Sequence, residues 1–344
     1  MPPSPAAARL TIDLHAIAAN WRTLSARAGA PAGAAIKADA YGLGAVPIAR
    51  YLVAQGCRDL FVATWAEAAT LGDTADGAIV HVLHGIEAAD LPTAKALPTA
   101  QPILDTAEQA ALWHQAAPGR ACDLMVDTGI NRLGLAPADL SATQGLNVDI
   151  LMSHLACADE PAHPHNARQR EAFAALGTPH RRRSLANSAG AYLGPDYVFD
   201  LIRPGLALYG GAPCPAATDL AQVARLHARI LQLRQLTPGD PVGYGATFIA
   251  ICPTRLAIVG LGYADGLPRA AGAKALLDGR EYPVVGRVSM DLTAIDVTDA
   301  PPLAVGDWLE IAFDLPTTAA ASGRSQYELL TGLGRRFQRR HLRA

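Results

Sequence analysis

One lysine stands at the end of a short apolar run, in the segment AAIKADAYGLGA at residues 34–45. Lys37 is one of only three lysines in 344 residues, and Tyr41 and a glycine-spaced turn follow it at once. Taken alone, a lysine at a strand end is usually a side chain that reaches for solvent. An amine in this place can also form an imine with a carbonyl compound. The polar residues around it must decide between these interpretations.

Polar side chains also follow other apolar runs in the first 210 residues. They are Asp127 with Arg132 in the loop beyond it, His154, Asn187 with Ser188, and Arg203. In a barrel of parallel strands the carboxyl ends of the strands share one face, and catalytic residues collect there. We therefore expect these side chains to line one site together with Lys37.

The runs that must position these residues are short, continuous and separated by stretches with helical spacing. Continuous apolar runs are typical of parallel strands that are covered on both faces. The runs span residues 34–38, 60–64, 78–84, 101–105, 123–127, 148–154, 183–187 and 199–203. Eight such units predict an α/β fold with a (β/α)₈ barrel of the TIM type, because a doubly wound sheet would not need eight repeats.

From about Leu226 the pattern changes to alternating strands separated by Pro, Gly and Asp turns. This pattern predicts a mostly antiparallel β domain. We expect a terminal helix at YELLTGLGRRF to close it, with the basic residues of segment 334–342 on the solvated face of that helix. The predicted domains are therefore a barrel at residues 1–226 and a β domain at residues 227–344. The first strand, residues 9–14, precedes the barrel and could pair with the second domain.

The composition excludes several classes of function. Half of the residues are hydrophobic and the net charge is −2, so nucleic acid and anionic membranes are poor candidates for a partner. No apolar stretch approaches the roughly 20 residues that cross a bilayer. Five scattered cysteines without a CxxC pair are typical of reduced thiols, which predicts a cytoplasmic protein. We interpret the HPH segment at residues 163–165 as an exposed loop before a helix, and we expect no metal site.

The loops after the seventh and eighth strands are the usual phosphate site of such a barrel. Small residues let backbone N–H groups approach an anion, so Ser188 and the amides near Gly205 suit that task. An amine at Lys37, a phosphate site across the barrel and a side chain at the ring nitrogen are what pyridoxal 5′-phosphate requires. With Arg203 opposite, the sequence predicts a site for this cofactor, and the interpretation of Lys37 as a solvated lysine becomes the weaker one.

The segment AIKADAYGLGA resembles the cofactor-lysine motif of the bacterial alanine racemases, a family with a barrel and a β domain. Further segments resemble the family's motifs in the same order: IDLHAIAAN, MVDTGINRLGL, SHLACADEP, ANSAG, IRPGLALYGG, VGYGATF, GLGYADGLPR, GRVSMDLTAIDV and YELL. The resemblance covers nearly the whole chain. It implies a homodimeric isomerase that interconverts L-alanine and D-alanine and supplies D-alanine for the peptidoglycan of the cell wall.

The resemblance assigns the cofactor to residues of the barrel. It implies that Lys37 forms the imine and acts as one catalytic base. Arg203 would bind the ring nitrogen, and Arg132 would reach the phenolic oxygen of the cofactor and the carboxylate of the substrate. The phosphate would be held by Tyr41, Ser188 and the backbone of Gly205 and Leu206, with Tyr263 of the β domain near that end.

The resemblance places the second base in the β domain. Tyr244 would be that base, and the backbone N–H of Met290 would help to hold the substrate carboxylate. In the family both residues come from the partner subunit, which implies a homodimer with two shared sites. His154, Asn187 and Asp291 are expected behind the residues that contact the ligands, with His154 as a relay between the tyrosine and Arg203.

These residue types suit racemisation. The reaction removes a proton from one face of the substrate carbon and returns a proton to the other, so one base is needed on each side. A tyrosine with a reference pKa of about 10 is a weak base at neutral pH, and a nearby cationic network would favour its phenolate. An arginine at the ring nitrogen can only donate and leaves that nitrogen neutral. Arg203 therefore predicts a racemase that forms little keto acid.

Two positions depart from the family's pattern. Some members carry a carbamylated lysine, which orients the active-site arginine, where this chain has Met125. Arg132 must then be oriented by Asp127, by Asn131 or by a bound anion. Arg335 falls near the position where some members place a tyrosine at the substrate entrance.

Three alternatives stay open at this point. A racemase of the same fold could prefer serine or accept several amino acids. A non-catalytic carrier of pyridoxal phosphate is disfavoured, because a carrier would not need the β domain that bears Tyr244. A decarboxylase of the same architecture typically has a catalytic cysteine, and Cys252, beside a proline in a turn, does not fit that role.

Overall fold

The structure is a computed structural model that describes residues 6–269 and 272–343. The chain forms two compact units, one at Ala16–Ala221 and one that combines Met1–His15 with Gln222–Ala344. The change of unit after the barrel thus lies at residues 221 and 222, whereas the sequence pattern places it at about residue 226. The N-terminal strand belongs to the unit of the C-terminal half.

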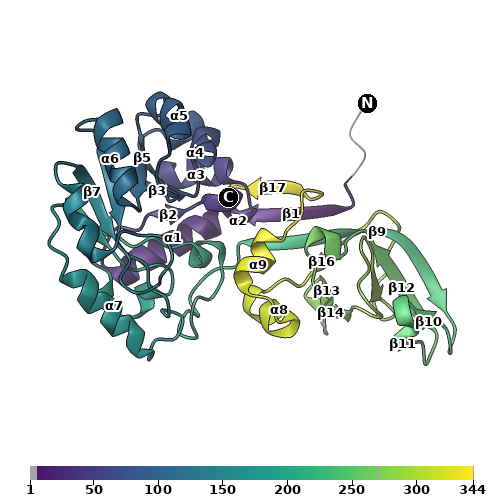
Figure 1. Cartoon of the computed structure of the whole chain (residues 1–344). Helices are drawn as coiled ribbons and strands as arrows, with labels where there is room; N and C mark the ends of the chain where they lie inside the picture. The colour runs from purple at the N-terminus through teal and green to yellow at the C-terminus, as the bar shows by residue number, and fades with distance from the viewer. Residues whose placement is uncertain (1–5, 270–271, 344) are drawn as a thin grey trace. The chain divides into compact units, whose positions relative to one another are not determined.

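The first unit is built on seven parallel strands that pair in chain order (Figure 1). They are β2 (Ala34–Ala35), β3 (Asp59–Val62), β4 (Ile79–Val82), β5 (Ala100–Leu104), β6 (Ala121–Met125), β7 (Asn147–Met152) and β8 (Arg182–Ser184). All four residues of β3 and all five of β5 are buried, as expected for strands covered on both faces. The predicted α/β fold with parallel strands is confirmed.

The eighth predicted strand, at residues 199–203, is an irregular segment. Its Ile202 donates to the carbonyl of Pro31 and accepts from Gly33, and on its other side Asp200 donates to the carbonyl of Arg183. It therefore lies between β8 and β2 and closes the barrel. Regular strand geometry is lost because Phe199 has a φ of 55° and because Pro204, the next residue in the chain, has no N–H to donate.

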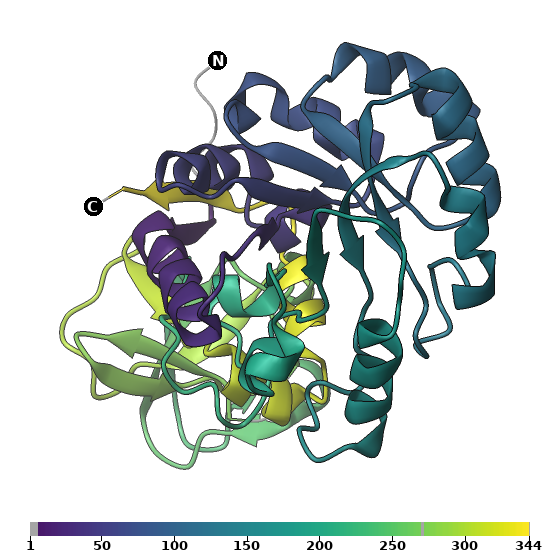
Figure 2. The same cartoon turned by 90° about the vertical axis from the view of Figure 1, so that its left-hand side faces the viewer.

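Helices lie on the outer face of the curled sheet (Figures 1 and 2). They are α1 (Leu14–Ala28), α3 (Ala45–Ala54), α4 (Trp65–Leu71), α5 (Leu91–Ala96), α6 (Ala107–Ala116) and α7 (Pro164–Ala174), and a short turn, α2 (Lys37–Tyr41), follows β2. Threonine side chains cap the N-termini of α4 and α6. Trp65, Trp113 and Met152 are buried in the core.

The interior of the barrel holds a closed ring of six polar side chains. The sequence interpretation of the strands as apolar runs did not anticipate it. Around the ring, each side chain contacts the next in the order His81, Asp59, Arg182, Asp149, Gln101, Asp123 and back to His81. One polar residue from each of β3 to β8 is thus tolerated in the core because it is paired with its neighbours.

His81 is fully buried between two carboxylates of this ring. Its Nε2 lies 3.0 Å from Oδ1 of Asp59, and its Nδ1 lies 2.5 Å from Oδ2 of Asp123. Both ring nitrogens must carry a proton to donate to both acceptors, which only the imidazolium does. Burial by itself lowers the pKa of His81, but Asp123 and Asp59 raise it to about 9.

The protein should therefore lose stability in alkaline solution. A raised pKa means that the contribution of His81 is complete below its unfolded pKa of about 6.5 and is lost as pH rises through about 9. This rise in the pKa of His81 corresponds to about 3 kcal/mol in the free energy of unfolding. We expect His81→Gln to unfold at a lower temperature than the wild type at pH 7. Between pH 7 and pH 10 its unfolding temperature should fall less steeply than that of the wild type. Thermal unfolding measures both, and His114→Gln, at an exposed position on α6, should behave as the wild type.

The second unit is a mostly antiparallel sheet around the long strand β9 (Ala224–Leu236). This strand pairs antiparallel with β1 (Ala8–Asp13), β12 (Thr254–Val259) and β16 (Trp308–Ile311). The remaining strands are β10 (Pro241–Val242), β11 (Phe248–Ile249), β13 (Lys274–Leu277), β14 (Arg280–Pro283), β15 (Thr293–Asp296) and β17 (Gln338–Leu342). The predicted antiparallel β architecture is confirmed.

The C-terminal segment differs from its predicted form. Two short helices, α8 (Leu315–Ser322) and α9 (Gln326–Thr331), end before the basic residues. Gly332 and Gly334 follow α9, and glycine favours the end of a helix. Residues 338–342 then form β17, which pairs in parallel with β1. The expectation that the basic stretch at 334–342 covers a helix face is therefore wrong.

None of the helices formed by residues 6–269 and 272–343 is long and apolar enough to cross a membrane.

Candidate active site

Lys37 lies just past the end of β2, at the start of an unusual turn. The four residues after it, Ala38 to Tyr41, have φ values of 54°, 54°, 52° and 57°. This is one turn of left-handed helix, in which Gly42 donates to the carbonyl of Ala38. The strand predicted at residues 34–38 therefore ends at Ala35. The turn places Lys37 and Tyr41 at its two ends.

The Lys37 amine is half-buried beside other charged groups. Burial and the positive charge of Arg132 lower the pKa of Lys37, and the carboxylate of Glu67 opposes this shift. A lowered pKa increases the fraction of neutral amine, which is the form that attacks a carbonyl group and accepts a proton.

Four of the predicted phosphate ligands gather in one place. The Oγ of Ser188 accepts hydrogen bonds from the N–H groups of Gly205 (2.9 Å) and Ala207 (3.2 Å). A Cβ on Gly205 would lie 2.2 Å from the hydroxyl of Tyr41, so only glycine permits this approach. Leu206 begins a short 3₁₀ turn, and its N–H has no partner within that turn. Hydroxyl and backbone N–H donors of this kind fit a phosphate group.

Tyr209 supports this cradle, and the sequence analysis did not single it out. Its hydroxyl donates to the carbonyl of Ala35 at 2.8 Å, and its ring packs on that of Tyr41 with the centroids 4.9 Å apart. The side chain is fully buried. The sequence signal that could have identified Tyr209 is its position in the segment PGLALYGG, four residues after Gly205.

Arg203 is buried and is held by two neutral acceptors. One of its terminal nitrogens donates to Oγ of Ser184 at 2.5 Å and the other donates to the carbonyl of Ser153 at 2.6 Å. Burial lowers the pKa of Arg203 to about 10, and the carboxylate of Asp123 acts in the opposite direction. The guanidinium therefore stays protonated at neutral pH and can only donate.

His154 and Asn187 lie on the same side of the barrel. Burial and the positive charges of Arg203, Arg132 and Lys37 lower the pKa of His154 to about 3. His154 is therefore a neutral imidazole at pH 7, next to a cluster of three cations. The side-chain oxygen of Asn187 accepts the N–H of Gly190 and so shapes the loop next to Ser188.

The loop that carries Arg132 is ordered by Asp127. Its carboxylate accepts the N–H groups of Gly129 (2.7 Å), Ile130 (3.0 Å) and Arg132 (3.2 Å). Burial would raise the pKa of Asp127, but these hydrogen bonds lower it. Asp127 therefore fixes the backbone of the loop, while the guanidinium of Arg132 has no hydrogen-bond partner within residues 6–269 and 272–343.

The β unit carries the other candidate residues. Tyr244 lies on a short turn between β10 and β11, and 67% of its surface is exposed. Tyr263 donates its N–H to the carbonyl of Ser289 at 3.0 Å, and the next residue donates to the carbonyl of Met290 at 3.0 Å. Tyr263 and Met290 therefore lie together on one patch of this unit. The structure divides the predicted residues into two sets, one on each unit.

Asp291 is held by an arginine that the sequence analysis did not single out. Arg336 contacts both oxygens of the buried carboxylate of Asp265, at 2.7 and 2.9 Å, and contacts Asp291 at 2.6 Å. Arg336 follows the helix α9 in the chain. Its contacts with Asp265 and Asp291 link the C-terminal segment to the chain around Tyr263 and Met290. Arg335, predicted near the substrate entrance, is exposed.

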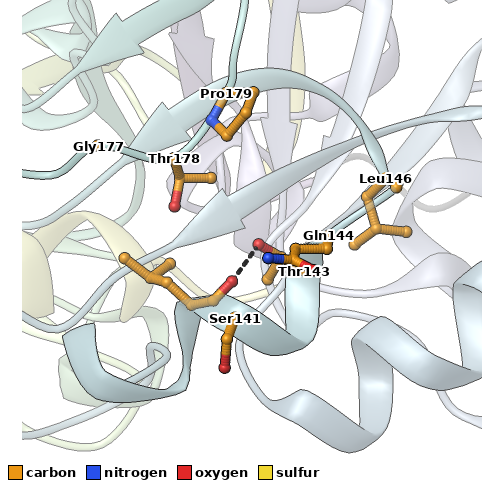
Figure 3. A pocket seen from close by; sticks show the side chains of 9 residues that line it. Ser141, Thr143, Gln144, Leu146, Gly177, Thr178 and Pro179 are labelled. Atoms are coloured by element: carbon orange, nitrogen blue, oxygen red, sulfur yellow. Dashed lines mark hydrogen bonds between the residues drawn. The ribbon is translucent and has the colours of Figure 1, made fainter.

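Other features of the described residues do not compete with this site. A hollow lined by residues 140, 141, 143–146 and 177–179 lies beside the N-terminal ends of β7 and β8, and the side chains that line it (Figure 3) are all uncharged. The hydroxyl of Thr143 is used internally, on the carbonyl of Leu140. Within residues 6–269 and 272–343 no group of His, Cys, Asp and Glu side chains could hold a metal ion.

Comparison with known families shows which family the chain belongs to. The family model described as "Alanine racemase, N-terminal domain" matches residues 12–213, and "Alanine racemase, C-terminal domain" matches residues 223–341. The chain belongs to the alanine racemase family.

Individual alanine racemases agree with this assignment over nearly their whole length. The alanine racemase of Acidiphilium cryptum is 45% identical over 348 residues, which cover 96% of this chain and 97% of that protein. "Alanine racemase, biosynthetic" of Agrobacterium fabrum is 42% identical, with 97% and 93% covered. The alanine racemase of Bartonella henselae, solved "with covalently bound pyridoxal phosphate", is 34% identical with a TM-score of 0.87, and the match covers 98% of this chain and 100% of that one.

Proposed function

We propose that the chain interconverts L-alanine and D-alanine with pyridoxal phosphate, using Lys37 and Tyr244 as the two bases. The observation that carries the proposal is that the barrel brings a lysine of lowered pKa together with a phosphate cradle and a buried arginine. The relative from Bartonella henselae, with its covalently bound cofactor, supports the choice of cofactor.

The bound cofactor would weaken the C–H bond of the substrate by drawing electrons away from it. Lys37 would hold the cofactor by its Nζ and would then take or return the substrate proton at that atom. Tyr41 and Ser188 would bind the phosphate, together with the backbone N–H groups of Gly205 and Leu206. Arg203, protonated and donor-only, would face the ring nitrogen and limit side reactions that lead to keto acid.

The phenol of Tyr244 would exchange the proton on the opposite face of the substrate. The guanidinium groups of Arg132 and Arg203 would favour its phenolate. Neutral His154 can relay a proton because one ring nitrogen donates while the other accepts. Arg132 and the backbone of Met290 would bind the substrate carboxylate, and Tyr263 would lie near the phosphate.

We propose further that the active form is a homodimer in which Tyr244 and Met290 complete the site of the partner subunit. Exposed apolar side chains of the β unit support this, because burial of such side chains against a partner is favourable. The exposed residues are Tyr244, Ile249, Ile251, Met290 and Leu292. The five cysteines, all without a disulfide, support a cytoplasmic location. The biosynthetic relative supports a role in supplying D-alanine for peptidoglycan.

Racemisation of L-alanine and L-serine by the purified protein tests the proposed activity. We expect kcat/KM for alanine to exceed that for serine by at least about tenfold, because one extra group in a small pocket costs about 1–3 kcal/mol. We also expect pyruvate to form far more slowly than D-alanine. Optical rotation follows the first reaction and lactate dehydrogenase with NADH detects the second. A preference for serine would identify the alternative substrate, and no racemisation with either would contradict the proposal.

A further inference from the structure

The left-handed turn after Lys37 needs support from outside itself. Each L-residue in this conformation costs roughly 1–2 kcal/mol, and here four follow one another. Hydrogen bonds along the turn give partial compensation, and the carboxylate of Asp39 accepts the N–H of Ala45 at 2.7 Å. The first N–H of the turn, that of Ala38, donates instead to Oε1 of Glu67 at 2.9 Å.

Glu67 is itself held firmly. It is the third residue of α4, and its N–H donates to the side chain of Thr64, which caps the helix. Its Oε2 accepts the N–H of Ala63, at the end of β3, at 2.7 Å. One carboxylate thus joins the residue after Lys37 to the end of the neighbouring strand, and each of its two oxygens accepts one backbone N–H.

A second helix of the barrel shows why this residue is a carboxylate. In α6 the equivalent position is Gln109, which follows the capping Thr106 in the same way. Its Oε1 accepts the N–H of Asp105 at 2.8 Å, but its Nε2 donates to the carbonyl of His84 at 3.4 Å. The neighbouring strand end offers a carbonyl to α6, whereas the left-handed turn offers an N–H to α4. Of these two positions, only residue 67 must therefore supply two hydrogen-bond acceptors.

We propose that Glu67 is a positioning residue for Lys37: its carboxylate fixes the left-handed turn and thereby aims the amine at the cofactor. The inference rests on the proposed role of Lys37. It predicts that loss of one acceptor at residue 67 displaces the amine without removing it. A displacement of about 1 Å at a reacting group can cost a hundredfold in rate.

The charge of Glu67 has an effect that can be separated from its geometry. The charged and titratable groups that act on Lys37 are Arg132 after β6, His154 after β7, and Glu67 on α4. The carboxylate of Glu67 raises the pKa of the amine. Its removal should therefore shift the pH midpoint of imine formation downward, whereas poor positioning should lower the limiting rate that the neutral amine reaches.

The test is the rate at which cofactor-free protein forms the borohydride-reducible link with added pyridoxal phosphate, measured from pH 6 to pH 10. Glu67→Gln places an NH₂ group against a backbone N–H while keeping the size of the side chain. Gln109→Glu is the matched control, because it places a carboxylate oxygen against the carbonyl of His84 at α6, away from the site. We expect the rate at high pH to fall at least about tenfold in Glu67→Gln, with a lowered pH midpoint, and to stay within about twofold of the wild type in Gln109→Glu.

Thermal unfolding of both variants shows whether the barrel is weakened equally. Equal losses of rate in the two variants, or a rate within twofold of the wild type in a folded Glu67→Gln, would overturn the proposal for Glu67. Lys37→Ala separates this outcome from a failure of the proposed function. If Lys37→Ala still forms the reducible link, the assignment of Lys37 itself is wrong.

Discussion

Lys37→Ala is expected to abolish the reducible link to pyridoxal phosphate and to lower kcat at least about a thousandfold. The variant loses the amine that holds the cofactor and also one of the two bases, and removal of a general base alone costs about 10²–10⁴ in rate. The phosphate cradle is built from other residues and should remain intact. The cofactor should therefore still bind, but reversibly.

Absorbance after gel filtration, with and without borohydride, measures this result directly. Lys95→Ala, at an exposed position on α5, is the matched control and should retain both the link and the activity. If residue 37 is Ala and the cofactor's absorbance still stays with the denatured chain on gel filtration after borohydride treatment, another residue holds the cofactor.

Tyr244→Phe is expected to lower kcat about a hundredfold or more while leaving the cofactor bound. The substitution removes the phenol oxygen that would exchange a proton on one face of the substrate. Exchange on the face served by Lys37 should continue. In deuterated water the variant should therefore still exchange the α-proton of one alanine enantiomer and should nearly lose exchange of the other.

Proton NMR of each enantiomer in deuterated water separates the two faces. Tyr51→Phe, on the outer helix α3, offers a control that should leave both exchange rates unchanged. Equal slowing of both enantiomers in Tyr244→Phe would mean that the tyrosine contributes to binding and not to proton transfer on one side.

The fold could be predicted where the pattern is local. Apolar runs at regular intervals reveal the parallel strands, and alternation with turn residues reveals the β unit. The ring around His81 could not be predicted in this way, because a buried polar residue is acceptable only when partners from other strands pair with it. Pairing of residues 338–342 with β1 likewise depends on two chain segments more than 300 residues apart in sequence.

The same contrast between local patterns and long-range contacts holds for the candidate site. The residues that we propose as ligand contacts stand in motifs, so Lys37 and Arg203 could be recognised from the residues around them. Glu67 and Arg336 act through contacts between distant segments, and no local spacing indicates them. Tyr209 stands in a motif, but its role depends on its contact with Ala35. The left-handed turn is equally hidden, since alanine and tyrosine disfavour this conformation and one aspartate does not predict four such residues in a row.

The central claim is that each site combines Lys37 of one subunit with Tyr244 of the other, and a mixture of two inactive variants tests it. When Lys37→Ala and Tyr244→Phe chains are co-expressed, half of the dimers should be mixed, and each mixed dimer should contain one site with both bases intact. Activity should then recover to about a quarter of the wild-type value per chain. If both bases came from the same chain, no intact site could form, and the mixture would show only the residual activities of the two variants.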